Sequence, residues 1–346
     1  MKLGINLGTF QAKPTVDMPL VLEAERLGFD SVWCGEAYGP DAVTPIAWVL
    51  AQTTKIKAGT GIMQMSARTP ACAAMTAMTL QALSNNRFLC GIGPSGPQVV
   101  EGWHGTPFGK PLARTREYIA IIRAILAREA PLEHQGEHYQ IPYHGPGATG
   151  LGKPLKSIVH AQPGMKYYTA SIMPAGLRLA GEIADGTLPI FMSPEAASEV
   201  SGPILAGMAK AGRPETLDNF DIAPHVKIRI GDDLAACRDE VRPELALYIG
   251  GMGARGKNFY NDYASRLGYE ADAHKIQDLF LAGDKRAAAA AVPDKLIDEI
   301  ALLGSPARIK DRLQAWQSIA RTRQLGTMVL TGATQEALRL VAETVL

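Results

Sequence analysis

A glycine-rich segment near residue 90 has the composition of a loop that binds an anion or a cofactor. Gly91-Ile92-Gly93-Pro94-Ser95-Gly96 matches the pattern G-x-G-x-x-G directly after an apolar run. Glycines let backbone N–H groups approach a ligand closely, and Ser95 adds a hydroxyl. A Rossmann site would need the loop to open into a helix, with an acid about 20 residues further on at the next strand end. Because Pro94 and Pro97 stiffen this loop, we favour a different anion site over a Rossmann site or a bare turn.

Two other segments have backbone features that suit a ligand site. Gly59-Thr60-Gly61-Ile62 ends an apolar run with alternate glycines, which indicates a bulge, a strained peptide or a simple bend. Pro174 opens a predicted helix, so free N–H groups between Ser171 and Ala175 would lie at its N-terminus. Helix N-termini bind phosphate, although an ordinary capped helix start is the alternative.

Few side chains are placed for acid–base or metal chemistry. His104, beside Trp103, follows the glycine-rich loop and is the better placed histidine for proton transfer. His134 and His138 are four residues apart but lack the H-E-x-x-H pattern, so we predict no metal site. No G-x-S-x-G occurs, and a hydrolase therefore has little support.

These residues need a scaffold that brings strand ends together, and the chain predicts one. Short apolar runs alternate with amphipathic stretches, which is typical of parallel strands joined by helices. The predicted strands are 3–7, 31–34, 56–62, 87–92, 166–170, 186–191, 225–230 and 326–330. Eight strands in a chain of this length predict an α/β fold, a (β/α)8 TIM barrel, with a doubly wound sheet as the competitor. Chemistry in a barrel belongs on the loops that follow the strands.

The strand–helix alternation breaks twice. Residues 134–165 are dense in glycine and proline without a helical period, and residues 232–303 are rich in helix-forming residues. We expect one domain over 1–346, with insertions at these two places. The Ser305-Pro306 pair then predicts an N-cap and the first residue of a helix.

Composition excludes several classes of partner. The 346 residues carry 35 Lys+Arg against 34 Asp+Glu, a formal net charge of +1, so no field attracts nucleic acid. No run of 18 apolar residues predicts a membrane span, and the N-terminus does not resemble a signal peptide. The four cysteines are scattered singly, as expected of reduced thiols. We expect a protein of the cytoplasm.

The chain resembles the luciferase-like monooxygenase superfamily, and within it the actinobacterial oxidoreductases that depend on the deazaflavin coenzyme F420. The residues that carry the resemblance are Gly59–Pro70, Gly91–Trp103, Gly147–Pro154, Ala184–Gly186 and Tyr248–Asn261. The resemblance covers nearly the full length. It implies an insertion-bearing (β/α)8 barrel, usually a homodimer, that acts on a small-molecule substrate.

The resemblance also implies where the cofactor would lie. It implies a non-prolyl cis peptide at Gly61-Ile62 against one face of the ring, and Glu36 near the polar edge of the ring. Loop residues that would run along the cofactor are Gly93, Ser95, Gly96, Gln98 and Val99. The cofactor phosphate would meet Ser171, Ile172, Met173 and Pro174, and His104 or Tyr38 would handle a proton.

Departures from the family pattern limit what is carried over. Deazaflavin-dependent sugar-phosphate dehydrogenases carry a catalytic His and Glu where this chain has Ala37 and Gly96. Methylenetetrahydromethanopterin reductases carry a strand-one acid where this chain has Asn6. Ile172 and Met173 stand where small residues are usual at the phosphate. Neither substrate class is therefore transferred.

Three functions are consistent with the sequence. The first is an F420-dependent oxidoreductase that moves a hydride between the deazaflavin C5 and a carbonyl, alkene or alcohol. The second is a monooxygenase that uses reduced flavin mononucleotide (FMN), oxygen and a partner reductase. The third is a non-catalytic sensor that keeps the cofactor pocket.

Overall fold

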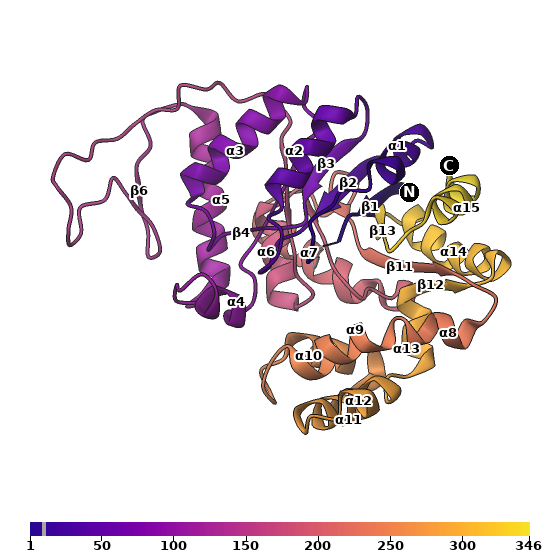
Figure 1. The fold of residues 1–346 in the computed structure, drawn as a ribbon. Coiled ribbons are helices and arrows are strands. Elements are labelled where there is room, and N and C mark those ends of the chain that lie inside the picture. The colour runs from indigo at the N-terminus through magenta and orange to yellow at the C-terminus, as the bar shows by residue number, and fades with distance from the viewer. Residues whose placement is uncertain (9–11) are drawn as a thin grey trace.

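The computed structural model describes residues 1–8 and 12–346 and is built on a parallel barrel. Eight strands occur where the sequence predicts them (Figure 1). They are β1 (Lys2–Asn6), β2 (Ser31–Cys34), β3 (Lys57–Thr60), β5 (Phe88–Gly93), β8 (Lys166–Thr169), β9 (Gly186–Thr187), β11 (His225–Ile230) and β13 (Thr327–Thr331). Short strands β4 (Met63–Gln64) and β10 (Asp221–Ile222) extend the sheet. The predicted barrel class is confirmed.

An irregular strand closes the barrel. β10 and β11 are the two halves of this strand, and a short break at Pro224 separates them. On one side Ala223 N donates to Thr187 O at 2.8 Å, and on the other Val329 N donates to Pro224 O at 3.0 Å. β13 pairs with β1, whose other neighbour is β2. The ring of strands is therefore continuous.

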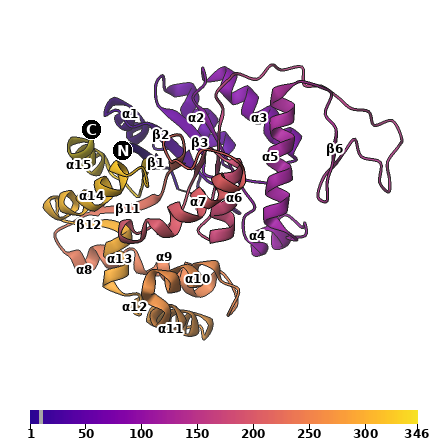
Figure 2. The same cartoon turned by 180° about the vertical axis from the view of Figure 1, so that it is seen from behind.

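Helices cover the outside of the barrel (Figures 1 and 2). They are α1 (Met18–Arg26), α2 (Val43–Gln52), α3 (Pro70–Leu83), α4 (Pro97–Gly102), α5 (Pro111–Ala127), α6 (Pro174–Ile183), α7 (Ser198–Lys210), α14 (Pro306–Arg321) and α15 (Gln335–Val345). A 3-10 turn, Pro194–Ala196, precedes α7. The predicted cap is confirmed, because the Ser305 hydroxyl accepts from Arg308 N and Pro306 begins α14. Among the described residues, no helix is long and apolar enough to cross a membrane.

Packed side chains fill the lower barrel interior. This inner cluster is Trp33, Leu89, Tyr168, Leu188, Ala223 and Val329. The rings of Trp33 and Tyr168 meet edge to face with centroids 4.9 Å apart. Gly59 makes room for them, because a Cβ there would lie 2.6 Å from the Trp33 ring. The interior below the strand ends is thus solid.

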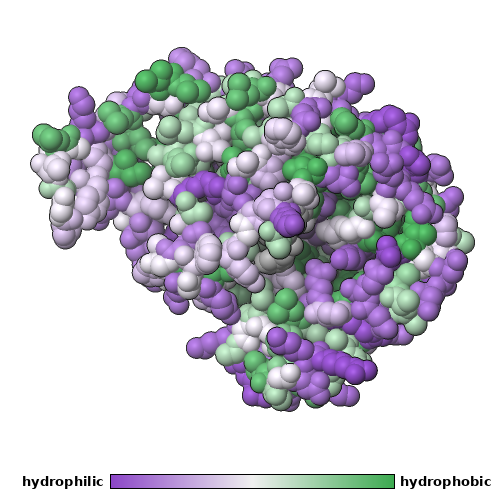
Figure 3. Space-filling model, in the orientation of Figure 1, coloured by the Kyte–Doolittle hydropathy of each residue, from purple (hydrophilic) through white to green (hydrophobic). Residues whose placement is uncertain are grey.

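The first interruption of the alternation forms an arm that projects from the barrel (Figures 1 and 2). It contains a hairpin of β6 (His134–Gln135) and β7 (Gln140–Ile141), and most of the following 20 or so residues lack regular structure. Leu151, Leu155 and Ile158 are 84%, 69% and 92% exposed. Figure 3 shows hydrophobic residues on this arm beside hydrophilic ones.

The second interruption is a helical layer at one end of the molecule, drawn in orange in Figure 1. It comprises α8 (Leu234–Asp239), α9 (Arg242–Ala246), a π-helical turn (Leu247–Gly251), α10 (Phe259–Ala264), a second π-helical turn (Ser265–Tyr269), α11 (Glu270–Leu281), α12 (Lys285–Ala290) and α13 (Asp294–Ile300). Val241, Leu245, Ile276 and Ile297 belong to its own apolar core.

The helices of the insertion end just before the expected boundary near residue 303. Residues Ala301–Gly304 form strand β12, which pairs in parallel with β11, Leu302 opposite Ile228. The helices therefore end at Ile300. The apolar run of β12 is only four residues long and directly follows α13 without a turn, so the sequence gives no separate signal for this strand.

Candidate active site

A cavity of about 1610 Å³ lies at the carboxyl ends of the barrel strands. All eight strands, or the residues directly after them, contribute to its wall. Representative lining residues, one from each barrel strand or the segment after it in chain order, are Asn6, Glu36, Gly61, Gly93, Thr169, Ile190, His225 and Thr331. This end of a TIM barrel is where enzymes of this architecture place their active sites.

Most of the residues predicted from the sequence lie together in this cavity. The lining includes Glu36, Tyr38, Gly61, Ile62, Gly93, Ser95, Gly96, Gln98, Val99, Ser171, Ile172 and Met173. Pro174 is absent from the lining, and its successors Ala175 and Gly176 take its place there. His104 is also absent. Segments from three strand ends and the start of α6 thus converge as expected.

The predicted cis peptide between Gly61 and Ile62 is present. The Ile62 side chain packs against the strand beside it, because a Cβ on Gly93 would lie 3.0 Å from two Ile62 carbons. Gly91 is tighter still, since a Cβ there would stand 1.8 Å from the carbonyl oxygen of Thr60. These glycines let β3 and β5 approach closely below the cavity.

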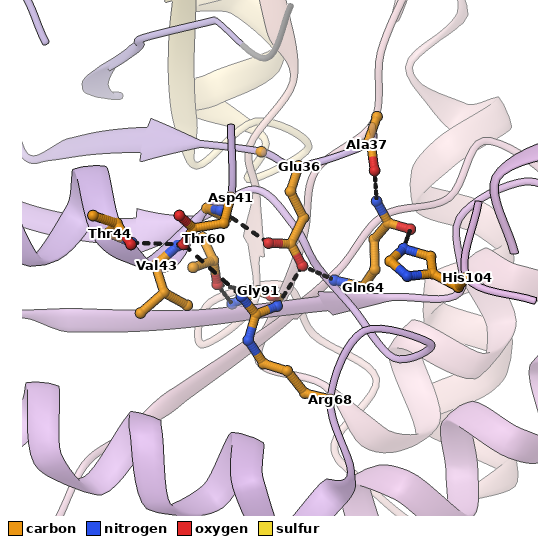
Figure 4. A network of polar contacts seen from close by, with 12 residues as sticks. Glu36, Ala37, Asp41, Val43, Thr44, Thr60, Gln64, Arg68, Gly91 and His104 are labelled. Atoms are coloured by element: carbon orange, nitrogen blue, oxygen red, sulfur yellow. Dashed lines mark hydrogen bonds and ion pairs between the residues drawn. The ribbon is translucent and has the colours of Figure 1, made fainter. Parts of the chain in front are cut away.

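The carboxylate of Glu36 accepts hydrogen bonds from three segments at the cavity edge (Figure 4). Its Oε1 accepts hydrogen bonds from Gln64 N at 2.8 Å and Arg68 Nη1 at 2.5 Å, while Oε2 accepts from Ala42 N at 2.9 Å. The side chain is only 6% exposed. The carboxylate is therefore directed at donors from β4, from the turn before α3 and from the N-cap residue of α2, and it holds the end of β2 in place.

His104 reaches the site only through another side chain. Its Nε2 lies 3.1 Å from Gln64 Oε1, and Gln64 Nε2 donates to the carbonyl oxygen of Ala37 at 2.8 Å. Figure 4 shows this row of three residues beside Glu36. His104 lies outside the cavity wall, so its contact with a ligand would be indirect, whereas Tyr38 lines the cavity directly.

The start of α6 presents backbone donors to the cavity. Within the described part of the chain, no side chain caps this helix at its N-cap residue, Met173. The Ser171 hydroxyl accepts from Met173 N at 3.3 Å, while Ala175 and Gly176 belong to the cavity lining. Uncapped N–H groups together with the helix dipole attract an anion. This corner fits a phosphate.

The loop before α6 is supported from the helical insertion. Arg266 Nη2 donates to the carbonyl oxygen of Ile172 at 2.7 Å, and Nη1 approaches the Met173 sulfur at 3.7 Å. Ile172 is buried, so its bulk is directed partly into the protein. The large side chains at this loop are thus held by the insertion, a contact that the sequence could not reveal.

Several residues of the cavity were missed in the sequence. They are Asn6, His225, Lys227, Tyr248 and Tyr260. The sequence does contain a signal for two of them. Val226 and Ile228 are buried under the helices, and successive side chains of a strand point to opposite faces of the sheet. His225 and Lys227 therefore had to face the other side of β11. Tyr248 and Tyr260 come from the insertion, and only its fold brings them to the barrel.

Few charged or titratable groups line the cavity around β11 and the helical insertion. Burial lowers the pKa of His225 to about 4, so its ring is neutral at pH 7. Lys227 Nζ lies 3.5 Å from Glu244 Oε2. Burial raises the pKa of Tyr260 to about 12. Within residues 1–8 and 12–346, no group of three or more His, Cys, Asp or Glu side chains could hold a metal ion.

Sequence comparison places the chain among known proteins. The family model for luciferase-like monooxygenases matches residues 2–323. A Mycobacterium tuberculosis protein with the provisional name coenzyme F420-dependent oxidoreductase Rv3520c is 42% identical over 344 residues, which cover 99% of this chain and 98% of that protein. The 5,10-methylenetetrahydromethanopterin reductase of Archaeoglobus fulgidus is 26% identical, with 93% of this chain and 92% of that protein covered.

Solved structures share the fold. The coenzyme F420-dependent tetrahydromethanopterin reductase of Methanopyrus kandleri superposes with a TM-score of 0.79 at 23% identity, covering 99% of this chain and 98% of that one. An F420-dependent secondary alcohol dehydrogenase gives 0.76 at 16% identity, with the same coverage. The FMN-bound oxygenating constituent of 3,6-diketocamphane monooxygenase from Pseudomonas putida gives 0.66 at 18%, covering 100% and 97%. The chain belongs to the luciferase-like monooxygenase family.

Proposed function

We propose that this protein is a coenzyme F420-dependent oxidoreductase that transfers a hydride between the deazaflavin and a small organic substrate. The observation that carries the proposal is the 42% identity over 99% of the chain to a protein named for that cofactor. The cavity at the strand ends supplies the location. When bound, the deazaflavin would supply the hydride chemistry at its C5 carbon.

The residues present fit such a cofactor. The wall formed by Gly61, Ile62 and Gly93 is apolar, and its two glycines have no side chains, which suits the face of a flat ring. The loop of Ser95, Gly96, Gln98 and Val99 continues along the same wall, so its residues would run along the cofactor. The uncapped start of α6 would take the phosphate.

The size of the cavity favours two ligands over one. Pockets for single small molecules measure about 300–1,000 Å³, whereas this cavity measures about 1610 Å³. A cofactor and a substrate can therefore lie side by side, as direct hydride transfer requires. Tyr38, which lines the cavity and is 59% exposed, would handle the accompanying proton.

Two alternatives use the same pocket. FMN also combines a flat ring with a phosphate, and an FMN-bound protein shares the fold, which favours a monooxygenase with a partner reductase as the second candidate. A sensor that binds the cofactor without turnover is the third. That the protein acts as a homodimer in the cytoplasm stays a prediction.

A turnover assay separates the three. Purified protein is given reduced F420 and a panel of ketones, enones and aldehydes, and the return of oxidised F420 absorbance is followed. We expect substrate-dependent oxidation of the cofactor. Oxygen-dependent turnover with reduced FMN alone would support the monooxygenase, and binding of F420 without turnover on any panel member would support the sensor.

A further inference from the structure

The cavity wall has two unlike halves. One half, from the ends of β2, β3 and β5, contains a patch of small and apolar residues that includes Gly35, Gly61 and Ile62. The other half carries Asn6 from β1 and His225 from β11, together with aromatic residues of the insertion. If the first half receives the cofactor ring, as in the proposed function, the second half is left to face the substrate.

The hydrogen bonds of Asn6 determine which nitrogen of His225 carries the proton. Asn6 Oδ1 accepts from Gly8 N at 2.6 Å, so the amide nitrogen of Asn6 must point the other way. That nitrogen lies 3.4 Å from His225 Nδ1. Because an amide N–H can only donate, Nδ1 must accept, and the neutral ring then carries its hydrogen on Nε2.

The Nε2 atom of His225 has no hydrogen-bond partner among the described residues, although it is buried. Such groups are rare in folded proteins because leaving a buried donor unpaired is unfavourable. His225 as a whole is half-buried and lines the cavity. Because His225 lines the cavity, a ligand seated there would supply the acceptor that Nε2–H lacks among the described residues.

Three aromatic rings lie on the side of β11 that adjoins β9. Ile190 pairs with His225, and the next residue, Phe191, has a left-handed φ of 55° that turns the chain at the cavity wall. The ring centroids of Phe191 and Tyr248 are 5.2 Å apart, and those of Tyr248 and Tyr260 are 4.7 Å apart. Phe191, Tyr248 and Tyr260, here called the aromatic wall, present aromatic rings beside His225, and the two tyrosines also carry phenol hydroxyls.

We propose that His225 donates a hydrogen bond from Nε2 to the carbonyl oxygen of the substrate, while the aromatic wall holds an apolar body. The substrate class is therefore a ketone or aldehyde with a bulky hydrocarbon part, rather than an unfunctionalised alkene. Asn6 is a positioning residue that keeps the donor on Nε2. The role of the bound carbonyl in turnover rests on the proposed function, whereas its binding does not.

The first test needs neither cofactor nor substrate. The full chain is labelled with ¹⁵N-histidine, and its ring nitrogens are observed by NMR between pH 5 and pH 8. We expect His225 to be neutral, with hydrogen on Nε2, and we expect a mixture of both neutral tautomers in Asn6→Leu. A hydrogen on Nδ1 in the wild-type protein would overturn the proposal.

The second test measures ketone binding to the same protein without cofactor. Cyclohexanone is titrated into wild type, His225→Gln, which keeps a side-chain N–H, and His225→Phe, which keeps an aromatic ring without a donor. We expect a saturable shift of the His225 Nε2 resonance, nearly unchanged affinity in His225→Gln, and about tenfold weaker binding in His225→Phe. Equal binding by His225→Phe, or no binding to wild type, would overturn the proposal.

A smaller ketone tests the aromatic wall. Wild type should bind cyclohexanone more tightly than acetone, and Tyr248→Ala should lose most of that preference while acetone binding stays the same. An unchanged preference would contradict the role of the wall. A separate titration with oxidised F420 reports on the proposed function, so loss of cofactor binding and loss of ketone binding are distinguishable.

Discussion

The backbone N–H of Glu36 donates to the carbonyl oxygen of Ile62 at 3.3 Å, across the gap between the second and third strand ends. The carboxylate of Glu36 continues this connection by accepting from the backbone of Gln64, two residues after Ile62. One residue therefore holds a whole segment of the cavity wall by its main chain and its side chain. The shape of this wall depends on Glu36 more than on any direct contact that its carboxylate makes with a ligand.

Glu36→Gln should destabilise the protein. The amide has one acceptor oxygen where the carboxylate has two, and it turns an N–H₂ group toward buried donors. Arg68, whose side chain is 17% exposed, would lose its closer charged partner and keep only the 3.9 Å contact of Nη2 with Asp41 Oδ1. Breaking a buried ion pair on one side costs about 3 kcal/mol. Urea unfolding of the variant should show a loss of this order, together with weaker cofactor binding.

A surface carboxylate provides the matched control. Glu137 pairs with Lys110, but the two side chains are 56% and 70% exposed. Solvent screens such pairs, so Glu137→Gln should change the free energy of unfolding much less than Glu36→Gln. If both variants lost the same free energy of unfolding, the hydrogen bonds of Glu36 would contribute no more to stability than an exposed ion pair does.

Gly93→Ala should weaken deazaflavin binding. Its new Cβ would stand 3.0 Å from two carbons of Ile62, so that side chain must shift within the cavity wall. Gly102→Ala is the control, since a Cβ there meets nothing within 4 Å. Fluorescence titration with F420 should show at least a severalfold loss of affinity in Gly93→Ala only. Unchanged affinity in both variants would place the ring elsewhere.

The start of α6 should distinguish ligands by their phosphate. In Gly176→Ala the Cβ would stand 2.1 Å from Ser171 Oγ, which must move away from the helix start. We expect about tenfold weaker binding of F420, whose phosphate would meet these N–H groups, with little change for the phosphate-free deazaflavin chromophore. Parallel titrations with both ligands give the answer. An equal loss for both would indicate general damage to the pocket.

His225 should make the protein less stable in mild acid. Burial lowers its folded pKa from 6.5 to about 4, so protonation favours the unfolded chain as the pH falls from 6.5 to 4. Its neighbours across the adjoining strands, Asn6, Ile190 and Val329, are uncharged, and Lys227 is paired with Glu244.

The loss should reach about 3 kcal/mol at most, since each unit of pKa shift corresponds to about 1.4 kcal/mol. Urea unfolding at pH 7 and pH 4.5 measures it. His225→Phe should lack this part of the pH dependence. Glu23 still titrates in the variant, but at lower pH, because its hydrogen bond with Arg26 is the main cause that lowers its pKa to about 2. The same slope in both proteins between pH 6.5 and pH 4.5 would contradict the assignment.

The barrel could be predicted because its strands are local features. Each barrel strand is a short buried run, such as Ser31–Cys34, and turn residues or helices separate one run from the next. The glycine-rich loop and the segment at Gly61 and Ile62 both follow such runs, so the architecture alone brings them to one end of the barrel. Backbone features of the site were therefore accessible from the sequence.

The side-chain contacts of the site could not be predicted from the sequence in the same way. Asn6 and His225 are 219 residues apart, and Glu36 accepts from donors 6, 28 and 32 residues away. Contacts between residues so far apart leave no periodic pattern in the sequence. Strand β12 was missed because its four residues follow a helix without a turn signal. Tyr248 belongs to the insertion, and the pattern of predicted strands does not show how the insertion packs on the barrel.

Equilibrium binding shows whether the cavity at the strand ends takes up a deazaflavin. Wild type and Gly93→Ala are titrated separately with oxidised F420 and with FMN, and ligand fluorescence is followed. We expect wild type to bind one F420 per chain saturably and at least tenfold more tightly than FMN, and we expect Gly93→Ala to bind F420 more weakly. Saturable binding of FMN without binding of F420 would contradict this expectation.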